Sequence, residues 1–321
     1  MTLQNGAQCP RVLTIIVSYN FEPWIERCLG SLEQSHYPTD VVVVDNASTD
    51  RTVEILAEKY RWVRLLRSQR NLGFGQANNL GMKIAIDENY DYVFLLNQDA
   101  WIEPDTIGPW VELSQQNPEY GVISPVHFNG QGSRLDSSFA RYIGGKLSIS
   151  SKKSALVEVT FINAAFWFMP VTVLRKVGGF SPLFFHYGED VDYIHRVRYY
   201  GYRVGYAPQT KGYHDRQDRP TPRAMQMRLD RIYYLTVVAD VNGSLFSRLW
   251  GGILAPWKPA LRAWRPCGSC VPSLWSQAWW RRAARWEPAP CRKRPRPRWG
   301  PRNWSRAPGK PEWRWGRRPR R

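Results

Sequence analysis

The sequence is poor in cysteine, with only five in 321 residues. Cys9 and Cys28 lie far apart, and Cys267, Cys270 and Cys291 fall near the C-terminus. So few cysteines give no disulfide framework, and a single C-x-x-C without a second pair is a weak metal or redox signal. The cysteine content therefore favours a protein of a reducing compartment.

Long apolar runs are also missing. A membrane-spanning helix needs about 18 consecutive apolar residues, and Asp240 and Arg248 interrupt the best candidate, residues 232–254. No basic segment precedes the short apolar run at residues 12–17, which is too brief for the core of a signal peptide. We therefore expect a cytoplasmic protein, with at most a peripheral contact at the inner face of the plasma membrane.

Outside one segment, the sequence has little net charge. The whole chain has a formal charge of +18, from 45 Lys and Arg against 27 Asp and Glu. Residues 256–321 hold 19 of the basic residues and only two of the acids, which leaves 26 against 25 in residues 1–255. We therefore expect a working domain at 1–255, with no nucleic-acid partner, and a separate basic tail at 256–321.

The tail, residues 256–321, also holds 10 of the 16 Trp and 12 of the 24 Pro residues. It has neither helical nor strand periodicity, which predicts a disordered segment that buries no core. Arg with interleaved Trp is compatible with binding to an anionic membrane surface or to nucleic acid. The abrupt start of the bias favours another interpretation, the translation of GC-rich DNA in a shifted frame.

Short apolar stretches alternate with helical patterns through the first hundred residues. Buried strands are predicted at residues 12–18, 41–44, 63–66 and 92–100, which are too short and too apolar for surface helices. Amphipathic patterns predict helices at residues 24–32, 52–60 and 73–86. This β-α-β-α-β order predicts an α/β domain with a mainly parallel sheet and right-handed crossovers.

The second half of the domain shows weaker patterns. We expect helices near residues 104–116, 171–177 and 189–200, and strands at 122–124 and 202–206. The apolar run 160–169 has small residues at its centre that leave room beside it. Residues 127–157 are polar and rich in Gly and Ser, which indicates a hairpin or a mobile loop.

Asn97, Gln98 and Asp99 end the most apolar of the predicted strands. In an open α/β sheet the ligand crevice lies beyond the carboxyl ends of the strands. A carboxylate placed there can hold Mg²⁺ or Mn²⁺ together with the oxygens of a bound phosphate. Capping of a helix that begins near Pro104 is an equally good interpretation of Asp99.

Two further stretches lie at predicted helix starts. Residues 71–81 contain glycines that let backbone approach a ligand, but they match neither G-x-G-x-x-G nor a P-loop, so a structural turn is as good an interpretation. Glu189, Asp190 and Asp192 begin a helix, where the helix dipole alone stabilises acids. Glu189 and Asp192 share a helix face and Asp190 points elsewhere, so at least one acid is free for another role.

Taken together, these motifs resemble those of the family 2 glycosyltransferases, which are nucleotide-sugar enzymes with the Rossmann-like GT-A fold. The matching segments are VSYN at 17–20, VVVVDNASTD at 41–50, NLGFGQANNLGM at 71–82, LLNQDA at 95–100, GGF at 178–180, GEDVDY at 188–193 and His214. Within the family, the chain most resembles bacterial rhamnosyltransferases and galactofuranosyltransferases of surface-polysaccharide assembly. The resemblance implies a GT-A fold, with helices flanking a mainly parallel sheet.

The resemblance implies a donor site and a metal site. The residues that match the nucleotide-sugar site are Ser18, Tyr19, Asp45, Asn71, Gly73, Asn79 and Gln98. Asp99 matches the last acid of the D-x-D metal motif, whose first acid is replaced by Asn97, and His214 matches a late histidine ligand. The implied cofactor is a divalent cation, Mg²⁺ or Mn²⁺.

The resemblance also implies a catalytic pair and an acceptor contact. Asp190 matches the general base, Glu189 its acidic neighbour and Trp167 an acceptor-side aromatic residue. We expect an inverting transfer of a sugar from dTDP-rhamnose or a UDP-sugar to a hydroxyl of a growing bacterial surface glycan. The acceptor is a glycan or a lipid-linked glycan, and the sequence does not distinguish the two. The competing hypothesis is a non-catalytic nucleotide-binding adaptor whose basic tail binds a membrane or nucleic acid, and the complete set of acids and histidine favours the enzyme.

Overall fold

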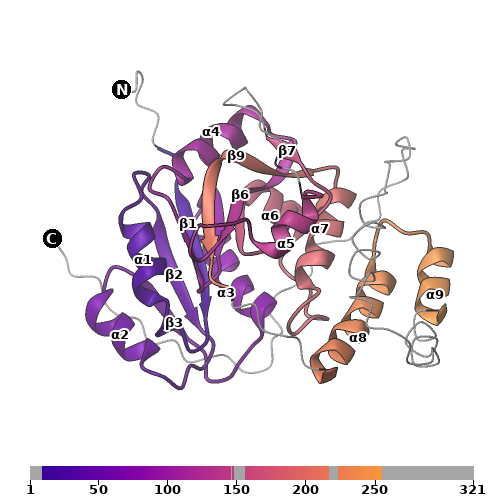
Figure 1. Ribbon diagram of the computed structural model, residues 1–321, viewed down its shortest axis with the longest axis horizontal. Coiled ribbons are helices and arrows are strands. Elements are labelled where there is room, and N and C mark those ends of the chain that lie inside the picture. The colour runs from indigo at the N-terminus through magenta and orange to yellow at the C-terminus, as the bar shows by residue number, and fades with distance from the viewer. Residues whose placement is uncertain (1–8, 146, 148–155, 217–222, 255–321) are drawn as a thin grey trace.

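The computed structural model describes residues 9–145, 147, 156–216 and 223–254. Its centre is one mixed sheet of nine strands, with helices on both faces (Figure 1). The predicted tail, residues 256–321, lies outside the described residues. The predicted α/β class is confirmed by this arrangement.

The first half of the sheet is parallel. It consists of β1 (Val12–Ser18), β2 (Asp40–Asp45), β3 (Arg64–Arg67) and β4 (Tyr92–Leu96), in the spatial order β3-β2-β1-β4. Each pair within this half is parallel, and a helix follows each of the first three strands. This is the arrangement that the alternating strand and helix patterns predict.

Helices cover both faces of the sheet, and the last two helices lie beyond it at one end of the molecule (Figure 1). The helices are α1 (Ile25–Glu33), α2 (Thr52–Lys59), α3 (Phe74–Asp87), α4 (Ile107–Gln116), α5 (Ser137–Tyr142), α6 (Val171–Val177), α7 (Glu189–Tyr199), α8 (Arg223–Ala239) and α9 (Leu245–Leu254). Leu13 and Ile15 of β1 pack in one cluster with Met82 of α3, whereas Ile16 packs on the opposite face with Leu29 of α1. Burial on both faces explains the nearly continuous apolar runs of these strands.

The second half of the sheet adds antiparallel strands. β8 (Phe166–Pro170) lies antiparallel between β4 and β6 (Tyr120–Asn129), and β9 (Arg203–His214) is parallel to β6. The short strands β5 (Ala100–Ile102) and β7 (Val157–Glu158) are both antiparallel to β9. Because β8 reverses direction between β4 and β6, the strands β4, β6 and β9 all run the same way.

Three predicted elements differ in the structure. The predicted strand 92–100 is two strands, because the chain turns at residues 97–99 and β5 then pairs with β9 instead of extending β4. Residues 127–157 contain the end of β6 and the helix α5, which is capped by the Asp136 carboxylate accepting from the backbone N–H groups of Ser138 and Phe139. The last strand is longer than the predicted 202–206, because β9 continues past a register shift against β6 and pairs with β5.

The last helices of the described chain are α7, which begins at the acidic motif, and α8 and α9, which follow β9. α7 begins at Glu189, as predicted, and α8 and α9 form a pair at one end of the molecule (Figure 1). Within the described ranges, no helix combines the length and the apolar character that crossing a membrane requires.

Candidate active site

The predicted site residues come from strand ends that meet at one edge of the sheet. β1, β2, β3 and β4 are parallel, and β9 runs in the same direction as β4. Their carboxyl ends therefore lie at the same edge, where an open α/β sheet binds its ligands. Ser18, Asp45, Asn97 and His214 each lie at or directly after such an end.

Asp99 and His214 form a direct pair at this edge. Nε2 of His214 lies 3.2 Å from Oδ1 of Asp99, and the imidazole is 2% exposed. The pairing of Ala100 with His214 in the β5–β9 ladder, and the 2.8 Å hydrogen bond from the Asp215 N–H to the Asp99 carbonyl, hold the two segments together. Burial by itself would raise the pKa of Asp99, but His214 and Arg216 outweigh it and lower that pKa. Asp99 is therefore a carboxylate at neutral pH, and it does not cap α4.

The Asp99 and His214 side chains fit a divalent cation as two of its ligands. Asp99 Oδ1 and His214 Nε2 converge, and the Oδ1 atom of Asn97 is buried without a hydrogen-bond partner in the described chain. Mg²⁺ and Mn²⁺ sites often use few protein ligands and complete their shell with waters and substrate phosphates. Among the described residues, no three His, Cys, Asp or Glu side chains are grouped to hold a metal without such help.

Asp45 is buried in a hydrogen-bond network at the end of β2. Its Oδ1 accepts from the hydroxyls of Ser18, at 3.1 Å, and Ser48, and its Oδ2 accepts from the Ser48 N–H at 3.3 Å. Ser18 is fully buried and Asp45 is 2% exposed. The hydrogen bonds therefore fix the Asp45 carboxylate at the end of β2, and the Ser18 hydroxyl is one of its donors.

Gln98 holds the backbone of Tyr19. The Tyr19 N–H donates to Gln98 Oε1 at 2.7 Å, and Gln98 Nε2 donates to the Tyr19 carbonyl at 3.1 Å. The Tyr19 side chain is 47% exposed. Of these two predicted donor-site residues, Tyr19 has its ring exposed to solvent. Both ends of the Gln98 side-chain amide are used in hydrogen bonds that hold the Tyr19 backbone.

The glycine-bearing loop after β3 is held by two asparagines. Oδ1 of Asn71 accepts from the Asn46 side chain at 2.9 Å and from the Gly73 N–H at 2.8 Å, and Oδ1 of Asn46 accepts from the Leu72 N–H at 2.7 Å. Gly73 has φ of 79°, and a Cβ there would lie 2.0 Å from the carbonyl oxygen of Phe185. Only glycine fits this position, so the loop packs closely on the segment that precedes the acidic motif.

Asn79 was predicted to contact the nucleotide sugar, and in the structure its side chain binds the backbone of Phe180. Its Nδ2 donates to the Phe180 carbonyl at 2.9 Å, and its Oδ1 accepts from the Phe180 N–H at 2.7 Å. Both ends of the amide are therefore used on one backbone residue. Asn79 joins α3 to the GGF segment at 178–180, and this contact argues against direct binding of the nucleotide.

The three acids at the start of α7 have different surroundings. Asp192 forms an ion pair with Arg196 at 2.9 Å, so it is a structural residue. Glu189 is 5% exposed, and its Oε2 atom has no hydrogen-bond partner in the part of the chain that the structure describes. Asp190 is partly exposed, and its Oδ1 accepts from the Val191 N–H at 2.8 Å.

The pKa values of Glu189 and Asp190 are both raised. Burial, and then the neighbouring Asp190 carboxylate, raise the pKa of Glu189 to about 8. Burial also raises the pKa of Asp190, to about 6, although the Val191 N–H and Arg216 oppose it. The two carboxyl groups titrate as a coupled pair that keeps one proton near neutral pH, and the pKa of Glu189 is the more strongly raised of the two.

Arg216 acts electrostatically on both acidic parts of the site, and sequence patterns did not predict it. Its Nη1 donates to the Ser138 hydroxyl of α5 at 2.9 Å. Its charge opposes the effect of burial on the pKa of both Asp99 and Asp190, so it lies within electrostatic reach of both carboxylates. The only feature of the sequence that could have pointed to Arg216 is its position two residues after His214. Its partner Ser138 belongs to α5, and that helix lies in a segment predicted to be a hairpin or a loop.

Trp167 lies in the core. Its indole is fully buried, stacks on Phe180 at 5.9 Å between ring centroids, and donates from Nε1 to the Ile162 carbonyl at 3.3 Å. β8 is an interior strand of the sheet, flanked by β4 and β6. Its side chains pack against α3, α6 and α7 on one face and against α4 on the other. The burial argues against the predicted contact with an acceptor.

Comparisons with known proteins identify the family of the chain. The family model described as glycosyl transferase family 2 matches residues 14–178. The N-acetylglucosaminyl-diphospho-decaprenol L-rhamnosyltransferase of Mycobacterium tuberculosis is 28% identical over 231 residues, which span 62% of this chain and 74% of that protein.

Solved structures share the fold. The mannosyltransferase PcManGT from Pyrobaculum calidifontis, in complex with GDP-Man and Mn²⁺, has a TM-score of 0.52 at 19% identity over 87% of this chain and 81% of its own. S. aureus TarS 1–349 in complex with UDP-GlcNAc has a TM-score of 0.53 at 18% identity over 77% of this chain and 73% of its own, and the match covers 41% of the longer TarS chain. The GT-A fold is confirmed, and because the family model matches more than half of the 321 residues, the chain belongs to glycosyl transferase family 2.

Proposed function

We propose that this glycosyltransferase moves a sugar, with inversion, from a nucleoside diphosphate to a hydroxyl of a lipid-linked or growing bacterial surface glycan. The observation that carries the proposal is the division of the site between two acidic parts. One part is the Asp99–His214 pair, and the other is the pair of neighbouring carboxyl groups of Glu189 and Asp190, whose pKa values are both raised. Arg216 interacts with both.

Asp190 is the proposed general base. Its raised pKa, about 6, leaves it ionised at neutral pH while making it a better proton acceptor than an ordinary aspartate. In the proposed step, the acceptor hydroxyl gives its proton to Asp190 as the oxygen attacks the anomeric carbon, and the bond to the nucleoside diphosphate breaks. Glu189, which holds its proton, lowers the negative charge that Asp190 would otherwise face.

The other part of the site is proposed to receive the departing diphosphate. Arg216 is a permanent cation at this place, and its hydrogen bond to Ser138 fixes its position. Asp99 and His214, with Asn97 beside them, are the residues that would hold Mg²⁺ or Mn²⁺. When bound, such a cation neutralises charge on the diphosphate. The Mn²⁺ in PcManGT, which shares the fold, is consistent with this assignment.

The donor and the acceptor are inferred from relatives. The name of the mycobacterial relative specifies transfer of L-rhamnose to a diphospholipid-linked sugar, and TarS 1–349 was solved with UDP-GlcNAc. We propose dTDP-rhamnose or a UDP-sugar as the donor for this chain, with the base and ribose near Tyr19, Asp45 and the loop at Asn71 and Gly73. The work would be done by the domain at 1–255, at the inner face of the plasma membrane.

The test is the substitution Asp190→Asn, with Asp192→Asn as the matched control on the same helix turn. Loss of a general base lowers turnover by about 10²–10⁴-fold. We expect nucleotide-sugar affinity to stay within threefold of wild type, since the proposal gives Asp190 a role in the transfer step and none in holding the nucleotide. Asp192→Asn breaks the 2.9 Å ion pair with Arg196 and should lower the melting temperature while retaining transfer. Near-wild-type turnover of Asp190→Asn would exclude the base role.

The pH dependence gives a second readout of the same proposal. The wild-type rate should rise as the pH increases through about 6, where Asp190 loses its proton. The adaptor hypothesis puts the function on residues 256–321, which lie outside the described residues. Deletion of that segment should leave nucleotide-sugar binding intact in the enzyme, whereas an adaptor would lose its partner.

A further inference from the structure

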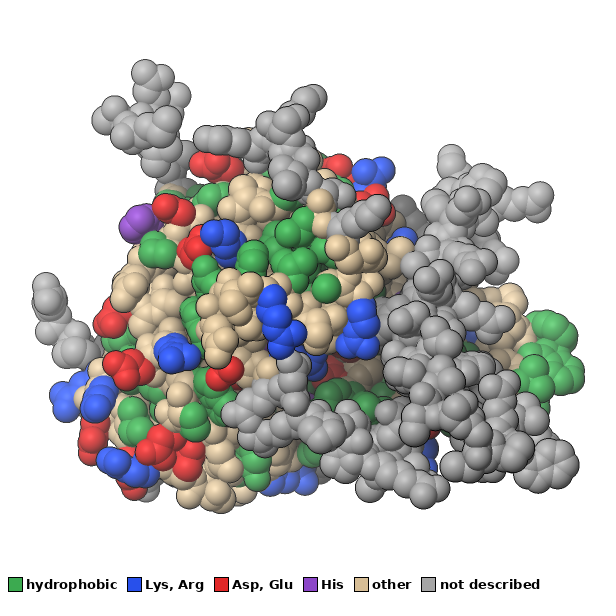
Figure 2. Space-filling model, in the orientation of Figure 1, with side chains coloured by type: hydrophobic (Ala, Val, Ile, Leu, Met, Phe, Trp, Pro, Cys, Tyr) green, Lys and Arg blue, Asp and Glu red, His purple; other side chains and the backbone are tan. Residues whose placement is uncertain are grey.

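The outward face of α9 is apolar and exposed. Six large hydrophobic side chains on this ten-residue helix are between 46% and 72% exposed: Leu245, Phe246, Leu249, Trp250, Ile253 and Leu254. Single exposed hydrophobic residues are common, but a continuous patch of this kind on one helix marks a binding surface. The patch lies at the end of the molecule farthest from α2, where Figure 2 shows hydrophobic side chains gathered at the edge.

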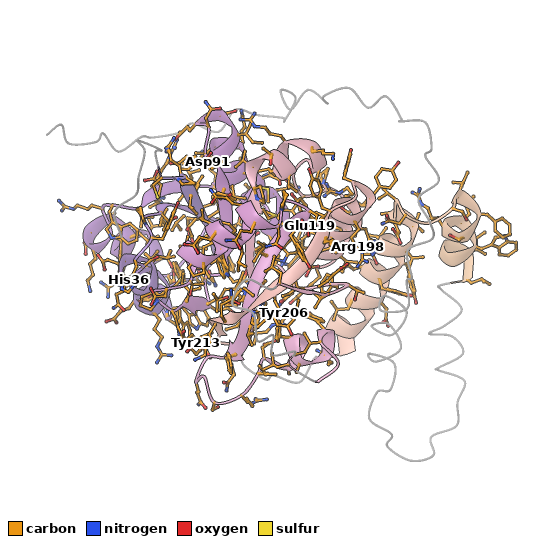
Figure 3. All side chains as sticks on the ribbon, turned by 90° about the horizontal axis from the view of Figure 1, so that it is seen from above. His36, Asp91, Glu119, Arg198, Tyr206 and Tyr213 are labelled. Carbon is orange, nitrogen blue, oxygen red and sulfur yellow. The ribbon has the colours of Figure 1, made fainter. Side chains whose placement is uncertain are left out.

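The helix packs on the protein through its glycines. A Cβ at Gly251 would lie 2.8 Å from Val237, and one at Gly252 would lie 2.8 Å from Val238, so these glycines allow α9 to approach α8 closely. The large side chains therefore lie away from α8, and Figure 3 shows side chains on the outer side of α9 pointing away from the molecule. This is the reverse of a helix that buries its apolar face against its own domain.

The α8–α9 pair is attached to the helix that carries the proposed base. Nδ2 of Asn242, between α8 and α9, donates to the His195 carbonyl of α7 at 2.9 Å. Ile232 of α8 lies against Gly188, directly before Glu189, since a Cβ at Gly188 would be 2.6 Å from Ile232. Whatever binds α9 is therefore fixed in position relative to the start of α7, which carries Glu189 and Asp190.

We propose that the apolar face of α9 docks on an anionic lipid surface. At about 1.5 Å per residue, ten residues extend about 15 Å, which is half of the roughly 30 Å hydrocarbon core of a bilayer. Amphipathic helices that bind a membrane without spanning it lie in the plane of the interface, with the apolar face buried in it. The sequence that follows α9 supplies the charge complement, because residues 256–321 contain 19 Lys and Arg against two acids.

The docking has a consequence for the reaction, and this step alone depends on the proposed function. The contacts of α8 with Gly188 and of Asn242 with α7 hold the α9 face in a constant position relative to Asp190. A lipid-linked acceptor presents its sugar next to the membrane surface. Docking through α9 would thus bring the base to the acceptor hydroxyl.

The experiment is sedimentation of the full chain with vesicles, in the absence of any nucleotide sugar. Vesicles of phosphatidylcholine with phosphatidylglycerol are compared with vesicles of phosphatidylcholine alone. We expect the wild type to bind the anionic vesicles, and the triple variant Phe246→Ser, Leu249→Ser, Trp250→Ser to bind them at least tenfold more weakly. Trp62→Ser, which changes a 43% exposed residue beside α2, is the matched control and should bind as the wild type does.

Several results would overturn the proposal. These are absence of wild-type binding, equal binding to neutral vesicles, and unchanged binding of the triple variant, which would assign the interaction to residues 256–321 alone. A wild-type dimer in lipid-free sedimentation velocity that the triple variant abolishes would instead identify a second copy as the occupant. Phe246→Ser alone, at the most exposed position, repeats the test with the least risk to folding. Because no sugar transfer is measured, failure here is separate from failure of the proposed reaction.

Discussion

Nε2 of His214 lies 3.2 Å from Oδ1 of Asp99, and this contact joins the end of β9 to the turn after β4. The two residues are distant in sequence, because Asp99 lies in the turn between β4 and β5 and His214 ends β9. Their pairing depends on β5, which leaves the β4 turn and aligns Ala100 with His214. The short strand therefore has a functional consequence, since it sets the distance between the two predicted metal ligands.

Asp99→Ala should weaken metal-dependent nucleotide binding. The change removes the carboxylate of the pair, and we expect the affinity for UDP or dTDP with Mn²⁺ to fall by about tenfold or more, or about 1.4 kcal/mol. Titration calorimetry with Mn²⁺ and with EDTA measures the loss.

Asp105→Ala is the matched control for this prediction. Asp105 also pairs with a histidine, at 2.6 Å from His36, but the pair is on the surface, with the carboxylate 83% exposed. Exposed pairs contribute about 0–1 kcal/mol, and this one is remote from the strand ends. Equal effects of the two substitutions, or an unchanged affinity after Asp99→Ala, would contradict the metal assignment.

Gly73→Ala should disrupt the loop that covers the donor side of the site. A Cβ at Gly73 would lie 2.0 Å from the Phe185 carbonyl oxygen, and the φ of 79° costs any other residue about 1–3 kcal/mol. We expect a lower melting temperature together with weaker nucleotide-sugar binding, because the loop must move away from residues 184–188.

Gly30→Ala provides the control for the loop prediction. Gly30 lies inside α1, and a Cβ there meets no atom within 4 Å. Alanine in a helix interior is favoured over glycine by about 1 kcal/mol, so this variant should be slightly more stable than the wild type, with normal activity. A Gly73→Ala protein with wild-type stability and affinity would show that the loop is not closely packed.

Asn79→Ala separates structure from binding at a residue that sequence comparison places in the donor site. The substitution leaves the N–H and the carbonyl of Phe180 without their 2.7 Å and 2.9 Å partners. Each unpaired buried group costs about 1–3 kcal/mol, so thermal unfolding should shift clearly downward while nucleotide affinity, measured below the transition, changes less than threefold. The opposite pattern, normal stability with weak binding, would restore the nucleotide contact.

The sequence was most informative where a short pattern determines a local structure. The valines of β2 and the apolar run of β4 identify strands buried on both faces, and the polar residues after them identify the edge of the sheet. Asp99 and Asp190 could be proposed from position, because one ends an apolar strand pattern and the other lies at a predicted helix start, whereas His214 entered only through the resemblance to the family. The α/β class and the acidic motif could therefore be predicted.

What could not be predicted depends on contacts between distant residues. The roles of Gln98 and Asn79 are visible only once their amides are seen on the backbones of Tyr19 and Phe180. Trp167 was assigned to the acceptor side through the family resemblance alone, yet β8 is covered on both faces and the Trp167 side chain is buried. Arg216 needed α5, which supplies the Ser138 hydroxyl, and α5 has too few residues to show a helical period.

Glu189→Gln should change how stability depends on pH. The pKa of Glu189 is raised from 4.5 to about 8 by burial and by Asp190, so the folded protein holds a proton that the unfolded chain releases at lower pH. Between these two values the folded state binds more protons, and stability therefore falls as the pH rises. The stabilisation is complete below about pH 4.5 and is lost as the pH passes through about 8.

Glutamine resembles the protonated glutamic acid and cannot ionise, so the variant should lack this loss. We expect its melting temperature to gain on the wild type between pH 5 and pH 8.5, by about 2–4 °C for each kcal/mol recovered. Asp190 and Arg216 remain in both proteins, so their own titration largely cancels in the difference. Glu112→Gln, on the exposed side of α4, is the control and should follow the wild-type curve. A constant difference between Glu189→Gln and wild type across this range would mean that Glu189 is ionised at neutral pH and that the proton belongs to Asp190.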